Sequence, residues 1–250
     1  MAKTDAGSRA VMARRRKKDD NEGLTEEERL WKTLDFYATP PWAARAIAEL
    51  MRELWPDAKT IREPACGLMN MAEPMAEYFP EVLPSDVYAY TPNTPVRDFF
   101  DGSLWPEEPD CDVISTNPPF ITAADFLRTA LTRSRMGVVL LVRTVWVESV
   151  DRYPLFVGDH PCTQIAFFSE RVPMALGPWD PEVGSATSYA AMFWSHLHEP
   201  MPPRWIAPGT RARLSKRDDA MRFGIQRPMP LFPEAPCLPP STLPGEPSPV

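Results

Sequence analysis

Residues 112–143 read DVISTNPPFITAADFLRTALTRSRMGVVLLVR and contain two strand patterns on either side of one helix pattern. Asp112–Thr116 has the composition of a strand, and Ala123–Arg135 has the apolar periodicity of a helix. Gly137–Arg143 is the most apolar of the three, as expected of a strand buried on both faces of a sheet. Strands and helices in alternation predict an α/β fold.

The same alternation extends in both directions from this stretch. A capping box at Thr25 predicts the start of a helix over 24–36, and a proline pair before Trp42 predicts a second helix over 42–54. The complete pattern predicts a doubly wound sheet with helices between its strands. The further strands are expected at 60–63, 82–87, 163–169 and 188–194, with a helix over 71–78.

Length and composition indicate one folded core with appendages. The chain has 250 residues, of which 44% are hydrophobic and 24% charged, so a wholly disordered or coiled-coil protein is excluded. Four cysteines without a CxxC pair indicate neither a zinc site nor a disulfide framework. The longest apolar run is Val138–Val142, too short to cross a bilayer, so we expect a cytoplasmic protein that does not enter membranes.

Charge and proline content divide the chain into four parts. Residues 1–23 carry seven basic and four acidic residues and predict a flexible basic tail, followed by a folded domain over 24–200. Residues 201–227 form a basic segment in which Arg204–Arg227 holds seven basic residues against two acids. This excess could supply phosphate contacts, although the net charge of −7 disfavours indiscriminate nucleic-acid binding. Nine prolines in 228–250 predict a disordered tail.

Several residues that bind nucleotides in other proteins follow the predicted strands. In doubly wound folds the ligand lies beyond the carboxyl ends of the strands. The Glu63–Gly67 loop follows the first strand, and its glycine allows the backbone to approach a ligand. Asp86 stands 23 residues beyond Glu63, about the separation of a ribose-binding carboxylate. Asp98 and Phe99 offer a carboxylate and a ring for an adenine.

The sequence Asn117-Pro118-Pro119-Phe120 points to a reaction at an amine. Two prolines after an asparagine rigidly display one side-chain amide, one free carbonyl and one aromatic ring. The Asn117 Oδ1 and the Pro118 carbonyl could accept the two hydrogens of an exocyclic base amine, while Phe120 stacks on the base. A base within a duplex must be flipped out to reach such a pocket. Read alone, the motif could also be a strand-ending turn.

Together these motifs resemble the S-adenosylmethionine-dependent DNA N6-adenine methyltransferases with an NPPF or NPPY motif, over about residues 36–196. The motif order resembles the gamma class, and the short chain resembles solitary phage or prophage enzymes. The resemblance implies a Rossmann-like class I methyltransferase fold with a mostly parallel seven-stranded sheet and helices on both faces. It also implies in-line methyl transfer to N6 of adenine in DNA, with S-adenosylmethionine as cofactor. The residues it implies are Asn117, Pro118, Pro119 and Phe120 for catalysis, and Thr39, Pro40, Glu63, Pro64, Ala65, Gly67, Asp86, Asp98 and Phe99 for the cofactor.

One position departs from the family pattern. The family reads EPACGxG, whereas here Met69 stands at the second glycine, which would weaken cofactor binding if its side chain lay toward the ligand. Met69 therefore leaves open a non-catalytic DNA-binding relic. The resemblance leaves open two further alternatives, a methyltransferase acting on RNA and one acting on a protein glutamine amide, because the same NPPF-type chemistry serves those substrates.

Three further residues are candidates for binding the substrate. Arg143 and Trp146 follow the most apolar strand, where an arginine could hold a phosphate and a tryptophan could shape the base pocket. A buried tryptophan beside a solvated arginine is the competing interpretation. Arg171 follows a later strand and could contact DNA. No metal is predicted, because His196 and His198 have no third ligand nearby.

Overall fold

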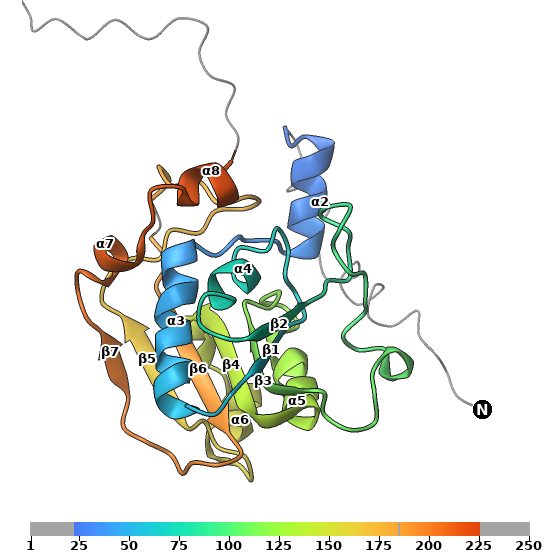
Figure 1. The fold of residues 1–250 in the computed structure, drawn as a ribbon, viewed down its shortest axis with the longest axis vertical. Coiled ribbons are helices and arrows are strands. Elements are labelled where there is room, and N and C mark those ends of the chain that lie inside the picture. The colour runs from blue at the N-terminus through green and yellow to red at the C-terminus, as the bar shows by residue number, and fades with distance from the viewer. Residues whose placement is uncertain (1–22, 185, 226–250) are drawn as a thin grey trace, which may run out of the picture.

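The computed structural model describes residues 23–184 and 186–225 (Figure 1). Nearly all of the predicted basic tail over 1–23 and the whole of the predicted proline-rich tail over 228–250 lie outside the described residues. The helices are α2 (Glu26–Leu34), α3 (Pro41–Leu54), α4 (Ala72–Met75), α5 (Ala123–Arg133), α6 (Tyr153–Val157), α7 (Thr210–Leu214) and α8 (Asp219–Phe223). The strands are β1 (Thr60–Glu63), β2 (Glu81–Pro84), β3 (Cys111–Thr116), β4 (Ser134–Arg143), β5 (Gln164–Phe168), β6 (Tyr189–Ser195) and β7 (Arg204–Ile206).

The seven strands form one mixed sheet in the order β2-β1-β3-β4-β6-β5-β7. β6 runs antiparallel to both of its neighbours, β4 and β5, whereas the other paired strands run parallel. The chain moves outward from β1 to β2 on one side and from β3 to β4 on the other. The topological switch point therefore lies between β1 and β3, where doubly wound folds bind their ligands.

Helices cover both faces of the sheet, and alternate residues of each strand enter opposite cores. Val139 and Leu141 of β4 pack with α3 and α4, whereas Val138 and Leu140 pack with α5 on the other face. In Figure 1 the helix α3 lies in front of the sheet, which runs from β7 to β2. The predicted doubly wound, mostly parallel seven-stranded sheet with helices on both faces is confirmed.

Two predicted elements are shorter than expected. The helix expected over 71–78 is limited to Ala72–Met75, although the Phe79 N–H still donates to the Met75 carbonyl at 3.1 Å and Pro80 cannot donate a further bond. The strand expected over 82–87 spans Glu81–Pro84, and one further bond, from the Ser85 N–H to the Glu63 carbonyl at 2.9 Å, follows it before the chain turns away. Asp86 instead forms an isolated bridge with Val96.

The segment after residue 200 belongs to the same fold as the residues before it. We expected a separate basic segment over 201–227, but Arg204–Ile206 is strand β7 and pairs in parallel with β5. Ile206 and Leu214 enter the core on the α3 face. The three-residue strand escapes sequence analysis because it is too short to show a period.

Candidate active site

A cavity of about 400 Å³ lies at the carboxyl ends of β1, β2 and β3. The residues that line it come from five places: the end of α2 with the stretch that follows it (33–39), the end of β1 with its loop, the chain after β2, the turn after β3, and Phe126 of α5. Of the residues predicted for the cofactor and for catalysis, the cavity is lined by Thr39, Glu63, Pro64, Ala65, Asp86, Asp98, Phe99, Asn117 and Pro119. Pro40, Gly67, Pro118 and Phe120 adjoin these residues in the chain but do not line the cavity.

The amide of Asn117 is oriented by two segments of the chain. Its Nδ2 donates to the Tyr37 carbonyl at 2.8 Å and to the Thr39 hydroxyl at 3.1 Å, and it also contacts Met174 Sδ at 3.6 Å. The Oδ1 is buried and has no hydrogen-bond partner among the described residues. Because a buried acceptor without a donor is costly, this oxygen is suited to a donor supplied by a ligand.

The ring of Phe120 lies in an aromatic and cationic environment next to Asn117. Tyr37 and Tyr189 have their ring centroids 5.5 Å and 6.2 Å from that of Phe120. The Arg143 guanidinium carbon lies 4.2 Å from the Phe120 ring centroid, in the geometry of a cation–π contact. The predicted substrate residue Arg143 is therefore beside the Asn117–Phe120 motif, and it covers part of the Phe120 ring on which the predicted base would stack.

Glu63 is a buried carboxylate at the end of β1. Its Oε1 accepts the Ala65 N–H at 3.2 Å, while its Oε2 has no hydrogen-bond partner among the described residues. Burial raises the pKa of Glu63 to about 8, because the charged form loses its hydration. An acid of this kind favours a cationic or hydrogen-donating ligand in the cavity.

Asp86 connects the second strand to the loop after the first. Its Oδ2 accepts the Gly67 N–H at 2.9 Å, and its Oδ1 accepts the Tyr88 N–H at 3.1 Å. Burial raises the pKa of Asp86 to about 6, against the opposing effect of these hydrogen bonds. Gly67 has φ +51°, and a side chain there would collide with the Phe36 ring. The loop therefore requires glycine at this position.

Met69 has the left-handed conformation that the family pattern assigns to glycine. Its φ is +67°, and its N–H donates to the Cys66 carbonyl at 2.8 Å. Leu68, Asn70 and Met71 line the cavity, whereas Met69 does not. The methionine side chain is thus directed away from the cavity, and the departure from the family pattern puts strain in the backbone rather than bulk in the cavity.

Replacing Met69 with glycine is expected to stabilise the protein by about 1 kcal/mol, because glycine adopts a positive φ without the steric cost of a Cβ. Urea unfolding would measure the change in the free energy of unfolding. Met221 is a matched control, since it is exposed and helical in α8, where glycine should destabilise. A loss of stability in Met69→Gly would contradict the strain at this position.

Asp98 and Phe99 both line the cavity, but Phe99 is also a core residue. The Phe99 side chain is only 2% exposed, and its ring stacks on Phe126 with centroids 5.1 Å apart. The Asp98 Oδ1 accepts the Phe100 N–H at 2.9 Å. Phe100 also lines the cavity, so the aromatic wall there is broader than the predicted pair.

Trp146 and Arg171 lie away from the cavity. Trp146 is buried in the α5-side core, where its ring meets those of Phe156 and Trp194. Arg171 donates to the Ala186 carbonyl and to the Ser188 hydroxyl, beside a smaller cavity that Tyr189 also lines. Of the three residues predicted to bind the substrate, the structure brings only Arg143 against the catalytic motif.

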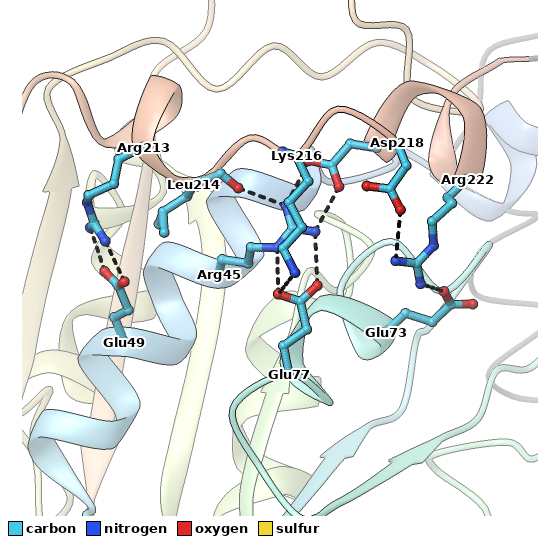
Figure 2. A network of polar contacts seen from close by, with 10 residues as sticks. Arg45, Glu49, Glu73, Glu77, Arg213, Leu214, Lys216, Asp218 and Arg222 are labelled. Carbon is cyan, nitrogen blue, oxygen red and sulfur yellow. Dashed lines mark hydrogen bonds and ion pairs between the residues drawn. The ribbon is translucent and has the colours of Figure 1, made fainter.

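Four basic residues of the described part of the C-terminal segment form ion pairs with acids earlier in the chain, and Figure 2 shows three of these pairs. The acids lie on α3, on α4 and in the turn after α4, so much of the local excess of positive charge is neutralised. The expectation of a basic DNA-contacting surface loses this support. The pairs are Arg204–Glu53, Arg213–Glu49, Lys216–Glu77 and Arg222–Glu73.

Sequence reasoning did not identify the segment just before Thr39 as part of the site. Residues 33–38 line the cavity. The ring centroid of Phe36 lies 4.6 Å from that of Tyr90, which also lines the cavity. The one available signal was the aromatic pair Phe36-Tyr37 ahead of Thr39-Pro40.

Within 23–184 and 186–225 the helices are too short or too polar to span a bilayer. No cluster of three or more potential metal-ligating side chains occurs in the same residues.

No protein-family model and no curated protein sequence match the chain. Solved structures of low sequence identity do resemble it. A Vibrio vulnificus protein, assigned as the modification subunit of a type I restriction enzyme, is 14% identical with a TM-score of 0.49, and the match covers 78% of this chain. This chain spans only 54% of that protein's length. A Listeria monocytogenes protein, assigned as a class I S-adenosylmethionine-dependent methyltransferase, is 13% identical with a TM-score of 0.48 over 77% of this chain and 72% of its own. TrmK from M. capricolum, bound to S-adenosylhomocysteine, is 8% identical with a TM-score of 0.42 over 62% and 70%.

Proposed function

We propose that this protein transfers a methyl group from S-adenosylmethionine to the exocyclic N6 amine of a flipped-out adenine in DNA. One observation carries the proposal. Among the residues that the structure describes, none donates to the buried Asn117 Oδ1, while its Nδ2 is held by Tyr37 and Thr39, and the same cavity contains the carboxyl groups of Glu63 and Asp86. An oriented acceptor for an amine thus shares a cavity with acids suited to a cationic nucleoside.

The cavity residues fit the proposed cofactor. Glu63 Oε2 is a buried acceptor without a hydrogen-bond partner within 23–184 and 186–225, and Asp86, which lines the same cavity, would receive the ribose. Thr39 and the loop through Gly67 would hold the methionine part, and Asp98, Phe99 and Phe100 the adenine. When bound, S-adenosylmethionine supplies an electrophilic methyl group on a positively charged sulfur.

The chain's own residues prepare the amine for this reaction. Asn117 Oδ1 and the Pro118 carbonyl would accept its two hydrogens, which directs the nitrogen lone pair out of the base plane. The nitrogen then forms a bond to the methyl carbon as the bond from carbon to sulfur breaks. One amine proton leaves to solvent, and no strong base is required because alkylation makes the nitrogen acidic.

An aromatic environment favours a nucleobase over a glutamine amide as the methyl acceptor. The rings of Tyr37 and Tyr189 lie next to that of Phe120, the last residue of the motif that begins at Asn117, and base–aromatic stacking contributes about 1–3 kcal/mol per base. Arg143 is available beside them for a phosphate or for the base itself. The preference for DNA over RNA rests on the family resemblance.

A direct assay tests this function. The purified protein is incubated with S-adenosylmethionine that carries a labelled methyl group. Three parallel reactions contain unmethylated plasmid DNA, RNA or a protein extract as the methyl acceptor. Digestion to nucleosides and mass spectrometry should detect N6-methyladenine in the DNA. Label confined to RNA or to protein glutamine would contradict the DNA assignment, and cofactor binding without transfer to any of them would favour a non-catalytic relic.

Cofactor binding is expected to tighten as the pH rises from 6 toward 8. The raised pKa of Glu63, about 8, means that this acid is largely protonated at pH 7 in the free protein. A sulfonium in the cavity favours the ionised form, so binding should release protons near neutral pH. Calorimetry in buffers of different ionisation enthalpy would give the number of protons released on binding. Glu63→Gln should reduce this release, and proton uptake on binding would contradict the prediction.

A further inference from the structure

Residues 35–39, which follow α2, form hydrogen bonds with both the first and the last residue of the Asn117–Phe120 motif. Tyr37 and Thr39 accept from the Asn117 amide, as described above. At the other end, the Phe120 backbone N–H donates to Asp35 Oδ2 at 2.7 Å. The two intervening prolines have no N–H to donate. Phe120 is therefore tied at its backbone by a side chain 85 residues away in the sequence.

Asp35 has a backbone conformation that brings its carboxylate to this position. It is the C-cap of α2, with φ +55° and ψ +40°, in the left-handed region. This conformation costs most residues free energy, although aspartate and asparagine tolerate it better than most. It ends the helix and turns the chain into the stretch that lines the cavity.

The bond from Phe120 to Asp35 affects the part of the site that would receive the base. A hydrogen bond to an ionised carboxylate is about twice as strong as one between neutral groups. The position of the Phe120 backbone sets the plane of the ring on which the base would stack. A misplacement of about 1 Å in such a group can cost on the order of a hundredfold in rate.

We propose that Asp35 is a positioning residue, which fixes the Phe120 backbone so that its ring stacks correctly on the target base. This inference rests on the proposed function. It assigns Asp35 no contact with the base or with the reacting atoms. The competing interpretation is that Asp35 only ends α2, in which case any change that weakens this helix would have the same effect.

Three variants separate these interpretations. Asp35→Gly keeps the left-handed conformation but removes the acceptor, whereas Asp35→Asn keeps both. Thr25→Ala removes the capping box at the other end of α2, at a cost of about 1 kcal/mol, and leaves Asp35 intact. If positioning matters, Asp35→Gly should lower kcat for base methylation at least about tenfold. Asp35→Asn and Thr25→Ala should keep near-normal kcat, and Thr25→Ala should bind the cofactor like the unmodified protein.

A second measurement does not depend on activity. With phenylalanine labelled by ¹⁵N, hydrogen exchange of the Phe120 amide should be faster in Asp35→Gly than in Asp35→Asn or in the unmodified protein. The proposal would be overturned if the Phe120 amide exchanged at the same rate in all of these proteins. It would also be overturned if Asp35→Gly left kcat unchanged, or if Thr25→Ala lowered kcat as much as Asp35→Gly does. If the unmodified protein methylates no nucleic acid, the proposed function fails, and the Phe120 amide alone then decides whether Asp35 fixes this backbone.

Discussion

Replacing Asn117 with alanine is expected to lower the rate of methyl transfer about a hundredfold or more, because preorganised polar groups contribute on this scale. The variant loses the buried Oδ1 that would accept a hydrogen from the amine. Asn117→Asp should fail as well, since a carboxylate oxygen in place of Nδ2 would face the Tyr37 carbonyl at about the present 2.8 Å with no proton between them. Transfer of labelled methyl to DNA would measure both variants.

The exposed Asn93 provides a control for this experiment. Asn93→Ala changes the same side chain on a surface away from the cavity, so it should retain full activity. Calorimetry should show that Asn117→Ala still binds S-adenosylmethionine, which would place its defect in the reaction rather than in folding. Normal methylation by Asn117→Ala would contradict the assigned role of this amide.

Replacing Arg45 with methionine is expected to destabilise the protein by about 3–5 kcal/mol, the usual cost of removing one partner of a buried ion pair. Arg45 lies on α3 and is 1% exposed. Its guanidinium donates twice to Asp219 and twice to Glu77, and once more to the Leu214 carbonyl (Figure 2). The variant would leave Asp219 buried without this partner. Urea unfolding would give the change in free energy.

Arg213→Met is the matched control for Arg45→Met. Arg213 also donates twice to a carboxylate of α3, that of Glu49, but this pair is exposed. Exposed pairs contribute about 1 kcal/mol or less, so this variant should change stability little. Equal effects of the two substitutions would show that the buried network does not hold the C-terminal segment to α3.

Helix-capping residues, prolines and hydrophobic periodicity were sufficient to predict most helices and strands of the fold. The capping box at Thr25 and the proline pair before Trp42 correctly predicted where α2 and α3 begin, within two residues. The bounds of β1 agree with the prediction, and β3 and β4 differ from it only at their first residues. These features depend on neighbouring residues in the chain, whose hydrogen bonds and periodicity are visible in sequence. The three residues of β7 are defined only by pairing with β5.

The chemistry of the site could be anticipated only in part. The acids and the Asn117-Pro-Pro-Phe120 motif were predicted because the carboxyl ends of parallel strands meet at one edge of the sheet. Trp146 could not be assigned in the same way. Its position after β4 allowed either a pocket wall or a core residue, and the choice depended on Trp194 and Phe156, which arrive from other elements.

The sequence by itself determined the alternation of strands and helices and the residue types that end each strand, because short-range sterics and hydrophobic periodicity act within a few residues. Tertiary structure alone decided which charges are available to a ligand. Four basic residues within 204–222 are paired with acids of α3, of α4 and of the turn after α4, and the Phe120 N–H is bound by Asp35. Such pairings depend on which distant segments the fold places within hydrogen-bond distance, and no local pattern contains that information.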